Sequence, residues 1–188
     1  IFPANPDLDM EGFIAVAGRD HKIYIESIDT SGKIDGKQSY ILGDELAWHT
    51  QRVTCLKVYQ PANEKTRVVV SASKDCLIKV WVIETKNLFK ELRGHQDTVF
   101  YVDIVDQQDL EPLIVSCGLD GHLMLWSLLL GTCLRNMDLG TIFSGPDKAL
   151  LCCCTYFPQG DHHQTPSILF GGEDEVISMW TIDTGEIT

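Results

Sequence analysis

One short pattern occurs four times along the chain of 188 residues and constrains its fold more than any other feature. Each copy has an apolar run, a turn that carries Asp, and a second apolar run. The copies are Ile14–Ile25, Val69–Val82, Ile114–Ser127 and Ile168–Thr181. The turn aspartates are Asp20, Asp75, Asp120 and Asp174, at spacings of 55, 45 and 54 residues. Such recurrence indicates a repeat architecture, in which each unit buries its apolar face against its neighbours.

The residues within each copy alternate in the way that β-strands do. In Leu77–Val82, successive side chains point to opposite faces and both faces carry bulk, which suits a strand that is covered on both sides. Further strands are expected on either side of each pair. They are Arg52–Tyr59, Thr98–Val105 and Ala149–Phe157 upstream, and Gln38–Leu42, Leu88–Leu92, Cys133–Met137 and a start at Glu186 downstream. The sequence therefore predicts an all-β chain with four antiparallel strands per unit.

Two of the turn aspartates are accompanied by a His, a Ser and a Trp at matched distances. The sets are His49, Ser71, Asp75 and Trp81, and His95, Ser116, Asp120 and Trp126. In both, Ser precedes Asp by four residues and Trp follows it by six. A buried indole N–H needs an acceptor, and a network in which every member is satisfied makes a core rigid. The pattern resembles the hydrogen-bonding tetrad of WD40-repeat β-propellers.

This resemblance implies an all-β fold of propeller blades, each of four antiparallel strands. One segment, residues 1–188, would form four blades at about 1–43, 44–93, 94–138 and 139–188. Because WD40 propellers usually have about seven blades, we expect the chain to be part of a larger ring. The rival fold is a β-sandwich with short strands, which does not require a His turn and a Trp at matched offsets.

The first and fourth copies depart from the tetrad pattern. The fourth keeps Asp174 and Trp180 but has Phe170 where Ser is expected. The first keeps only Asp20, with Glu26 at the Trp position. In these two blades we expect apolar packing to replace the network.

The acidic balance of the chain bears on its partners. A formal net charge of −12 and a pI near 4.7 disfavour direct binding to nucleic acid and to anionic membrane, and favour a basic protein segment. No apolar stretch reaches the roughly 18 residues of a membrane span. The chain opens with Ile1-Phe2-Pro3 and no initiator Met, so we expect a fragment of a longer protein.

Seven cysteines, an odd number, indicate reduced and mostly buried thiols in a cytosolic or nuclear protein. They are Cys55, Cys76, Cys117, Cys133, Cys152, Cys153 and Cys154. The alternative is zinc binding by Cys152–Cys154 with His162 and His163. Three adjacent cysteines in a strand alternate between its faces, however, so we expect no metal site.

Catalysis is a further alternative. Ser116, His95 and Asp120 have the residue types of a hydrolytic triad, but the resemblance engages this Ser with an indole and buries it. Gly118 and Gly171-Gly172 are turn glycines, and no phosphate-binding loop motif is present. We therefore expect a chain that is not an enzyme and has no cofactor.

The resemblance also implies a partner-binding surface, because WD40 propellers bind partners on their narrow top face. Carried over residue by residue, the positions that reach it are Arg52, Thr54, Thr98, Phe100, Ala149 and Leu151, and before each turn Asp they are Arg19, Lys74, Leu119 and Glu173. Phe100 is the strongest candidate, since aromatic residues anchor interfaces. Arg19, Arg52 and Lys74 would favour an acidic or phosphorylated partner.

Docking by the long loops is the alternative to this face. These loops are Asp29–Gly36, Gln60–Thr66, Asp106–Pro112 and Pro158–Pro166.

Two functions fit a propeller of this kind. The first is a protein-interaction scaffold, an adaptor subunit of a larger complex. The second is a peptide- or substrate-recognition module of a modifying enzyme such as a ubiquitin ligase. A catalytic propeller would need acid and base groups at the mouth of its channel, and no such set is evident.

Overall fold

The computed structural model describes residues 12–29, 31, 33–61, 66–106, 110–139, 149–157, 166–173 and 175–188. Within these ranges the regular structure is antiparallel β-sheet, and the described residues contain no α-helix. This confirms the prediction of an all-β fold of antiparallel sheets, of which two have the predicted four strands and two have three among the described residues.

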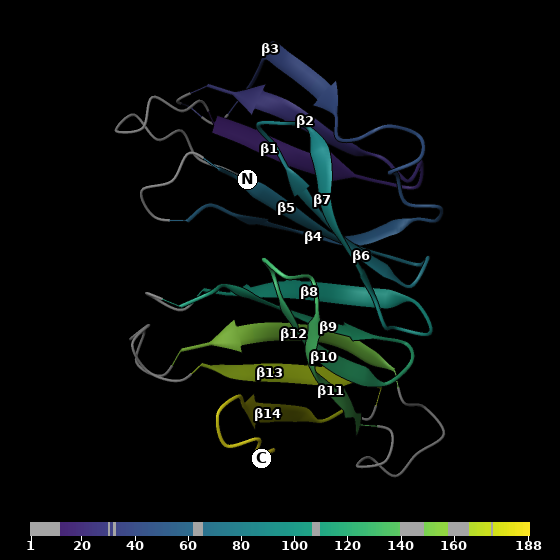
Figure 1. Cartoon of the computed structure of the whole chain (residues 1–188), viewed down its shortest axis with the longest axis vertical. Coiled ribbons are helices and arrows are strands. Elements are labelled where there is room, and N and C mark those ends of the chain that lie inside the picture. Colours follow the sequence, from purple (N-terminus) through teal and green to yellow (C-terminus); the bar gives the residue numbers. More distant parts are fainter. Residues whose placement is uncertain are drawn as a thin grey trace. The chain divides into compact units, whose positions relative to one another are not determined.

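The chain divides into two compact units, Ile1–Glu91 and Leu92–Thr188. The first unit holds the sheet β1-β2-β3 and the sheet β4-β5-β6-β7 (Figure 1). Its strands are β1 Gly12–Ala17, β2 Ile23–Ile28, β3 Ile34–Ile41, β4 Val53–Tyr59, β5 Val68–Ser73, β6 Leu77–Val82 and β7 Asn87–Arg93. Every neighbour in these sheets is also the next strand in sequence, so each sheet is a simple meander of hairpins.

The second unit repeats this arrangement with the sheets β8-β9-β10-β11 and β12-β13-β14 (Figure 1). Its strands are β8 Val99–Val105, β9 Leu113–Gly118, β10 His122–Ser127, β11 Cys133–Asp138, β12 Leu150–Tyr156, β13 Ser167–Gly172 and β14 Ile177–Thr181. A bridge between Trp180 and Ile187 adds the beginning of a further strand beside β14. That bridge lies where the sequence predicts a strand to start, at Glu186.

The tight turn after each Asp has a conformation that the sequence reveals in only one copy. The residues that follow the four aspartates, His21, Cys76, Gly121 and Glu175, all have a positive φ, between 61° and 76°. Only glycine adopts this left-handed region without strain, and Gly121 is the only glycine of the four. The hairpin geometry therefore outweighs the local preference of the other three residues.

The two sheets of the first unit pack face to face. Their shared core holds Phe13, Ile23, Ile25 and Leu42 from one sheet and Val69, Trp81 and Ile83 from the other. The inward side chains come from alternate positions of each strand, as the period of two requires.

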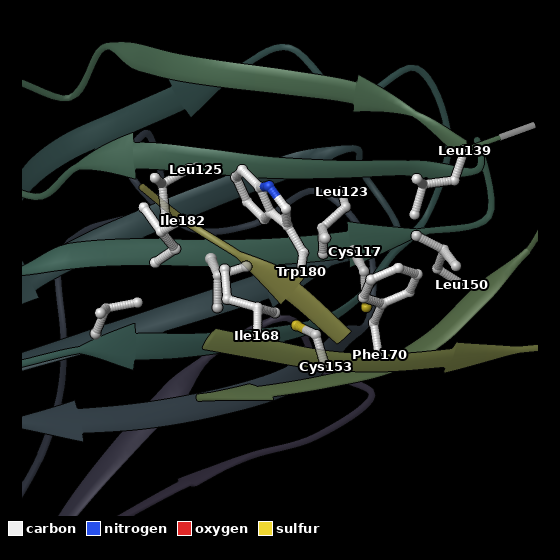
Figure 2. Packing of buried hydrophobic residues seen from close by; sticks show 12 residues of the cluster. Cys117, Leu123, Leu125, Leu139, Leu150, Cys153, Ile168, Phe170, Trp180 and Ile182 are labelled. Carbon is white, nitrogen blue, oxygen red and sulfur yellow. The ribbon is translucent and has the colours of Figure 1, made fainter. Parts of the chain in front are cut away.

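The second unit has an equivalent core. It joins Val105, Val115, Cys117, Leu123, Leu125 and Leu139 to Leu150, Cys153, Ile168, Phe170, Trp180 and Ile182, as Figure 2 shows for ten of these residues. One polar contact accompanies this packing, because Asp103 Oδ2 on β8 accepts a hydrogen bond of 2.9 Å from the backbone N–H of Thr155 on β12. Strands β8 and β12 are therefore held together both by apolar packing and by this hydrogen bond.

Two expectations from the sequence are wrong. Residues 34–36 of the predicted loop Asp29–Gly36 belong to β3, which starts four residues before the predicted Gln38. Cys152 and Cys154 are exposed, as is Cys133, whereas Cys153 is buried. Side chains alternate along β12, so only the middle cysteine of the three faces the core. Parts of the other three predicted loops lie outside the described residues.

Two neighbouring glycines of β13 give a matched test of this packing. A Cβ on Gly172 would lie 2.3 Å from the backbone oxygen of Ala149, whereas the nearest atom to a Cβ on Gly171 is 3.4 Å away. We expect Gly172→Ala to lower the free energy of unfolding by about 1–3 kcal/mol through overpacking. Gly171→Ala should change it by less than about 1 kcal/mol. Urea denaturation of both variants measures the difference, and equal losses would contradict the close approach.

Candidate functional site

In the second blade, four side chains form one hydrogen-bonded network: His49 before β4, Ser71 in β5, Asp75 in the turn after β5 and Trp81 in β6. Trp81 Nε1 donates to Ser71 Oγ at 2.9 Å. His49 Nε2 lies 2.8 Å from the same hydroxyl, and His49 Nδ1 lies 2.8 Å from Asp75 Oδ2. Because an ionised carboxylate can only accept, His49 Nδ1 is the donor to Asp75 Oδ2, and Ser71 Oγ lies within hydrogen-bond reach of both His49 Nε2 and Lys79 O. Each of these four side chains therefore has a hydrogen-bond partner.

The sheet β8–β11 has the same network with nearly the same distances. Trp126 Nε1 donates to Ser116 Oγ at 2.9 Å, His95 Nε2 lies 2.8 Å from that hydroxyl, and His95 Nδ1 lies 2.9 Å from Asp120 Oδ2. Asp120 also accepts from the backbone N–H of Gln96 at 2.9 Å. One carboxylate thus joins the His turn to the hairpin turn.

The environment of the two aspartates sets their protonation. Burial by itself raises the pKa of Asp75 and of Asp120, but the hydrogen bond and electrostatic attraction of the paired His, with two backbone N–H groups, outweigh it. The net pKa of each carboxyl is below its ordinary value. Both carboxylates are therefore charged acceptors at neutral pH.

The Ser-His-Asp sets offer no accessible nucleophile. Ser71 and Ser116 are both 0% exposed. Each hydroxyl is already held between an indole N–H and an imidazole. A nucleophile must reach a substrate carbonyl beside an oxyanion site, so these serines have a structural role.

The fourth sheet lacks this network. Trp180 is 1% exposed, and among the described residues its Nε1 has no hydrogen-bond partner. Figure 2 shows the indole nitrogen of Trp180 among the carbon side chains of the core, which include Phe170 in place of the expected Ser. Apolar packing therefore surrounds this indole. The predicted Asp174 lies outside the described residues.

The first sheet uses its equivalent residues differently. Asp20 is exposed, and its Oδ2 accepts from the Tyr24 hydroxyl at 2.5 Å, which lowers the pKa of Asp20. Glu26, at the Trp position, accepts from Ser39 Oγ at 2.7 Å. This blade carries surface hydrogen bonds where the second and third carry a buried network.

A β-bulge interrupts the first strand of three sheets, β4, β8 and β12, at the second residue of each strand. In β4, Val53 opposes Ser73 and Cys55 opposes Ala72, so Thr54 is the extra residue. Phe100 in β8 and Leu151 in β12 hold the same position. A bulge bends its strand and turns the extra side chain to a new direction.

The residue before the turn Asp is tied to this bulge by its backbone. Lys74 N donates to Arg52 O at 3.0 Å, Leu119 N to Thr98 O at 2.9 Å, and Glu173 N to Ala149 O at 3.2 Å. In these three sheets we call this edge, with its bulge and its Asp turn, the bulge end of the blade. The structure thus brings the predicted partner-binding residues of three blades together, whereas Arg19 precedes the Asp turn of the first sheet, where β1 pairs with β2 without a register shift.

Comparisons with known proteins match this geometry. A family profile described as "WD domain, G-beta repeat" matches residues 42–82 and 86–127.

The chain carries WD40 repeats.

Three similar proteins also bear on the family. The chain is 30% identical over 142 residues to "WD repeat- and FYVE domain-containing protein 4" of Homo sapiens, a match that covers 74% of this chain and 4% of that protein. It is 32% identical over 124 residues to "Cross-pathway control WD-repeat protein 2" of Flammulina velutipes, covering 64% of this chain and 37% of that protein. It is 33% identical over 127 residues to "Small ribosomal subunit protein RACK1y" of Oryza sativa subsp. japonica, covering 64% and 36%. The chain thus spans little more than a third of these relatives at most.

The side chains at the predicted partner-binding positions differ in exposure. Arg19, Arg52, Lys74 and Glu173 are exposed, as are Leu119 at 41% and Leu151 at 45%. Thr54 and Phe100 are half-buried. Thr98 and Ala149 are only 4% exposed each, so they contribute a backbone carbonyl and no accessible side chain. Arg52 holds the equivalent position in the second blade and is exposed, so the packing around each strand decides this burial and the bulge does not.

One organising residue of the second WD40 blade escapes the sequence reasoning. Lys79 is 3% exposed, and its Nζ donates to Ala47 O at 2.6 Å and Trp48 O at 3.1 Å and lies 3.1 Å from Glu91 Oε2. It therefore fixes the turn that delivers His49. The signal was a lone Lys inside the apolar run Leu77–Val82.

The described residues contain no group of three His, Cys, Asp or Glu side chains placed to hold a metal ion. His162 and His163, two of the candidate zinc ligands, lie outside those residues. In the described part of the chain no helix is long and apolar enough to cross a membrane.

Substitution of two tryptophans distinguishes the contribution of the tetrad hydrogen bond to stability from that of apolar packing. We expect Trp126→Phe to lower the free energy of unfolding by roughly 2–4 kcal/mol, because it opens a cavity and leaves Ser116 without its donor. Trp180→Phe should cost about 1–2 kcal/mol less, since the Trp180 indole has no hydrogen-bond partner among the described residues. Chemical denaturation measures both values. A loss from Trp180→Phe as large as that from Trp126→Phe would contradict the importance of the network.

The lowered pKa of Asp120 predicts a loss of stability in acid. A carboxyl whose pKa is lower in the folded state stabilises the fold above its ordinary pKa, and this stabilisation is lost as pH falls through the folded value. We expect wild type to lose stability below about pH 4. Asp120→Asn should be less stable than wild type by roughly 1–3 kcal/mol at pH 7, with the gap closing in acid. Denaturation across pH measures this gap, and a gap that widened in acid would contradict the assignment.

Proposed function

We propose that this chain is a non-enzymatic protein-interaction scaffold, an adaptor part of a larger complex, which binds partners at the bulge ends of its WD40 blades. The supporting observation is the shared position of Thr54, Phe100 and Leu151 as the extra residue of a bulge. A bulge re-aims a side chain while the ladder on both sides stays rigid, so it presents different residues on one constant backbone.

The chemistry of the bulge ends supports protein partners. In the second blade Arg52 and Lys74 are exposed and joined through the backbone, a basic pair in a chain whose net charge is −12. In the third blade Phe100 and Leu119 offer an aromatic and an apolar contact. Such a mixture suits a partner segment with acidic and apolar side chains.

Two further observations support the scaffold. The buried serines of both tetrads are withdrawn from any substrate. One similar protein, from rice, is by name a protein of the small ribosomal subunit, and so belongs to an assembly.

The location and the ring are part of the same proposal. All seven cysteines are free thiols, which supports a reducing compartment, the cytoplasm or the nucleus. We also propose that further blades, in addition to these four, complete a larger ring.

The second candidate is a peptide-recognition module of a modifying enzyme such as a ubiquitin ligase. The basic pair Arg52 and Lys74 favours it, because guanidinium and ammonium groups bind acidic or phosphorylated peptides. Such binding weakens as salt rises, whereas a scaffold buries a larger apolar area and keeps its partner.

The third blade provides the direct test. We expect the double variant Phe100→Ala and Leu119→Ser to lose the partners that co-purify with the full-length protein from its own cells, with affinities at least about ten-fold weaker. Quantitative mass spectrometry of the purified complexes measures this loss. Ile34→Ser is the matched control, because Ile34 is 61% exposed and lies at the start of β3, at the end of the first sheet opposite its Asp turn.

Three outcomes separate the hypotheses. Partners that survive about 500 mM salt support the scaffold, and partners lost there support the peptide reader. Partner binding by the double variant at the wild-type level would reject the bulge end as the docking site. Melting temperatures of all variants show whether any loss reflects unfolding.

A further inference from the structure

A second apolar surface lies at the other end of the third blade, away from its bulge. Four leucines gather in the two connections there, Leu110 before β9, Leu129 and Leu130 between β10 and β11, and Leu134 at the start of β11. Their exposed fractions are 66%, 53%, 65% and 49%. We call these four residues the leucine patch. Single exposed leucines are ordinary, but a cluster on one edge marks an interaction site.

The backbone of this turn does not require leucine. In the third blade Gly131 N donates to Ser127 O at 3.0 Å, and Ser127 N donates to Thr132 O at 3.0 Å. The fourth blade has the same two bonds at residues 181–186, at 2.9 and 3.0 Å, and Gly185 shares the positive φ of Gly131. Yet the fourth blade has Asp183-Thr184 where the third has Leu129-Leu130. The second blade is also polar there, with Glu84-Thr85.

Two hydrogen-bond donors of this turn are paired with Glu111, a residue from the connection before β9. Glu111 Oε1 accepts from Leu129 N at 3.1 Å and from the Ser127 hydroxyl. Leu130 N donates to Ser127 Oγ at 2.8 Å, and Leu128 N donates to Pro112 O at 3.3 Å. The turn is therefore fixed by its backbone and by Glu111. The side chains of Leu129 and Leu130 have no part in these bonds.

The charged residues that the structure describes around the leucine patch are mostly acidic. At this end of the second unit, those in the connections are Asp106, Glu111, Asp183 and Glu186. One base, Arg135, follows Leu134 in β11. The whole chain carries −12, so an occupant with basic side chains would be attracted to this end.

From the leucines and this charge together we propose that the leucine patch binds an amphipathic helix of a partner protein, with an apolar stripe flanked by Lys and Arg. Leu110, Leu129, Leu130 and Leu134 cover the stripe, and the surrounding carboxylates attract its basic flanks. The site lies at the opposite end of the blade from Phe100. It therefore does not depend on partner binding at the bulge ends.

A designed peptide tests this on the full chain. The probe is a fluorescein-labelled helix with Leu at positions i, i+3, i+4 and i+7 and Lys elsewhere, measured by anisotropy at about 150 mM salt. We expect saturable binding by wild type. The double variant Leu129→Ser and Leu130→Thr should bind at least about ten-fold more weakly, because it removes two apolar anchors. Serine is chosen at 129 so that no carboxylate is added beside Glu111.

Matched controls isolate the patch from general attraction between a basic peptide and an acidic chain. Leu46→Ser removes another exposed leucine, and Phe100→Ala alters the bulge end; both should bind the probe within about two-fold of wild type. The same peptide with Glu in place of Lys should bind much more weakly. Circular dichroism melts test folding, and Leu130→Thr alone serves if the double variant does not fold.

Several results would overturn the proposal. They are equal binding by wild type and the double variant, no saturable binding by wild type, and equal binding of the Glu peptide. A dimer seen by sedimentation that the double variant abolishes would make a second copy of this chain the occupant. Leucine-dependent binding to phosphatidylcholine vesicles would make a lipid surface the occupant.

Discussion

The carboxylate of Asp120, with its equivalent Asp75, is the point on which each of the two complete blades depends. It accepts from the paired imidazole and from backbone N–H groups on both sides, so a single side chain fixes the His turn and the hairpin turn together. The imidazole in turn orients the Ser hydroxyl, and the hydroxyl oxygen accepts a hydrogen bond from the indole N–H of the buried Trp. If the carboxylate were absent, the buried imidazole Nδ1 and the backbone N–H groups that it binds would lose their acceptor.

Packing can replace this network when the sequence provides bulk. In the fourth blade Phe170 takes the position where the second and third blades have Ser, and the Trp180 indole is as deeply buried as Trp81 and Trp126. The cost is one indole N–H without a partner among the described residues. The core that this sheet shares with the third blade contains large apolar groups from both sides, and it offsets that loss (Figure 2). Buried networks therefore add rigidity to blades that are held together mainly by apolar contact.

The two ends of a blade meet different physical demands. At the bulge end the innermost strand carries one residue more than its partner, so a side chain is turned outward while the backbone stays paired. At the other end the connections need only satisfy a turn, and a carboxylate from a neighbouring loop can do so. Both ends can thus change their exposed side chains with little effect on the sheet. This freedom suits a molecule proposed to bind more than one partner.

The amino-acid sequence by itself determined the all-β fold and the antiparallel strand units, because the period of two and the recurring Asp turn are local properties of the chain. It also indicated which His, Ser, Asp and Trp residues would meet, since their offsets repeat. It could not indicate that Thr98 and Ala149 are buried, because the segments that pack against each strand decide this. Nor could it indicate that Leu151 is the extra residue of a bulge, because a bulge arises only when two strands pair with unequal numbers of residues. Nor could it place His21, Cys76 and Glu175 in a left-handed conformation, which the closed hairpin imposes against their own preference. The exposed Cys152 and Cys154 and the carboxylate of Glu111 beside Leu129 were likewise decided by tertiary structure, because each depends on which face or loop lies opposite.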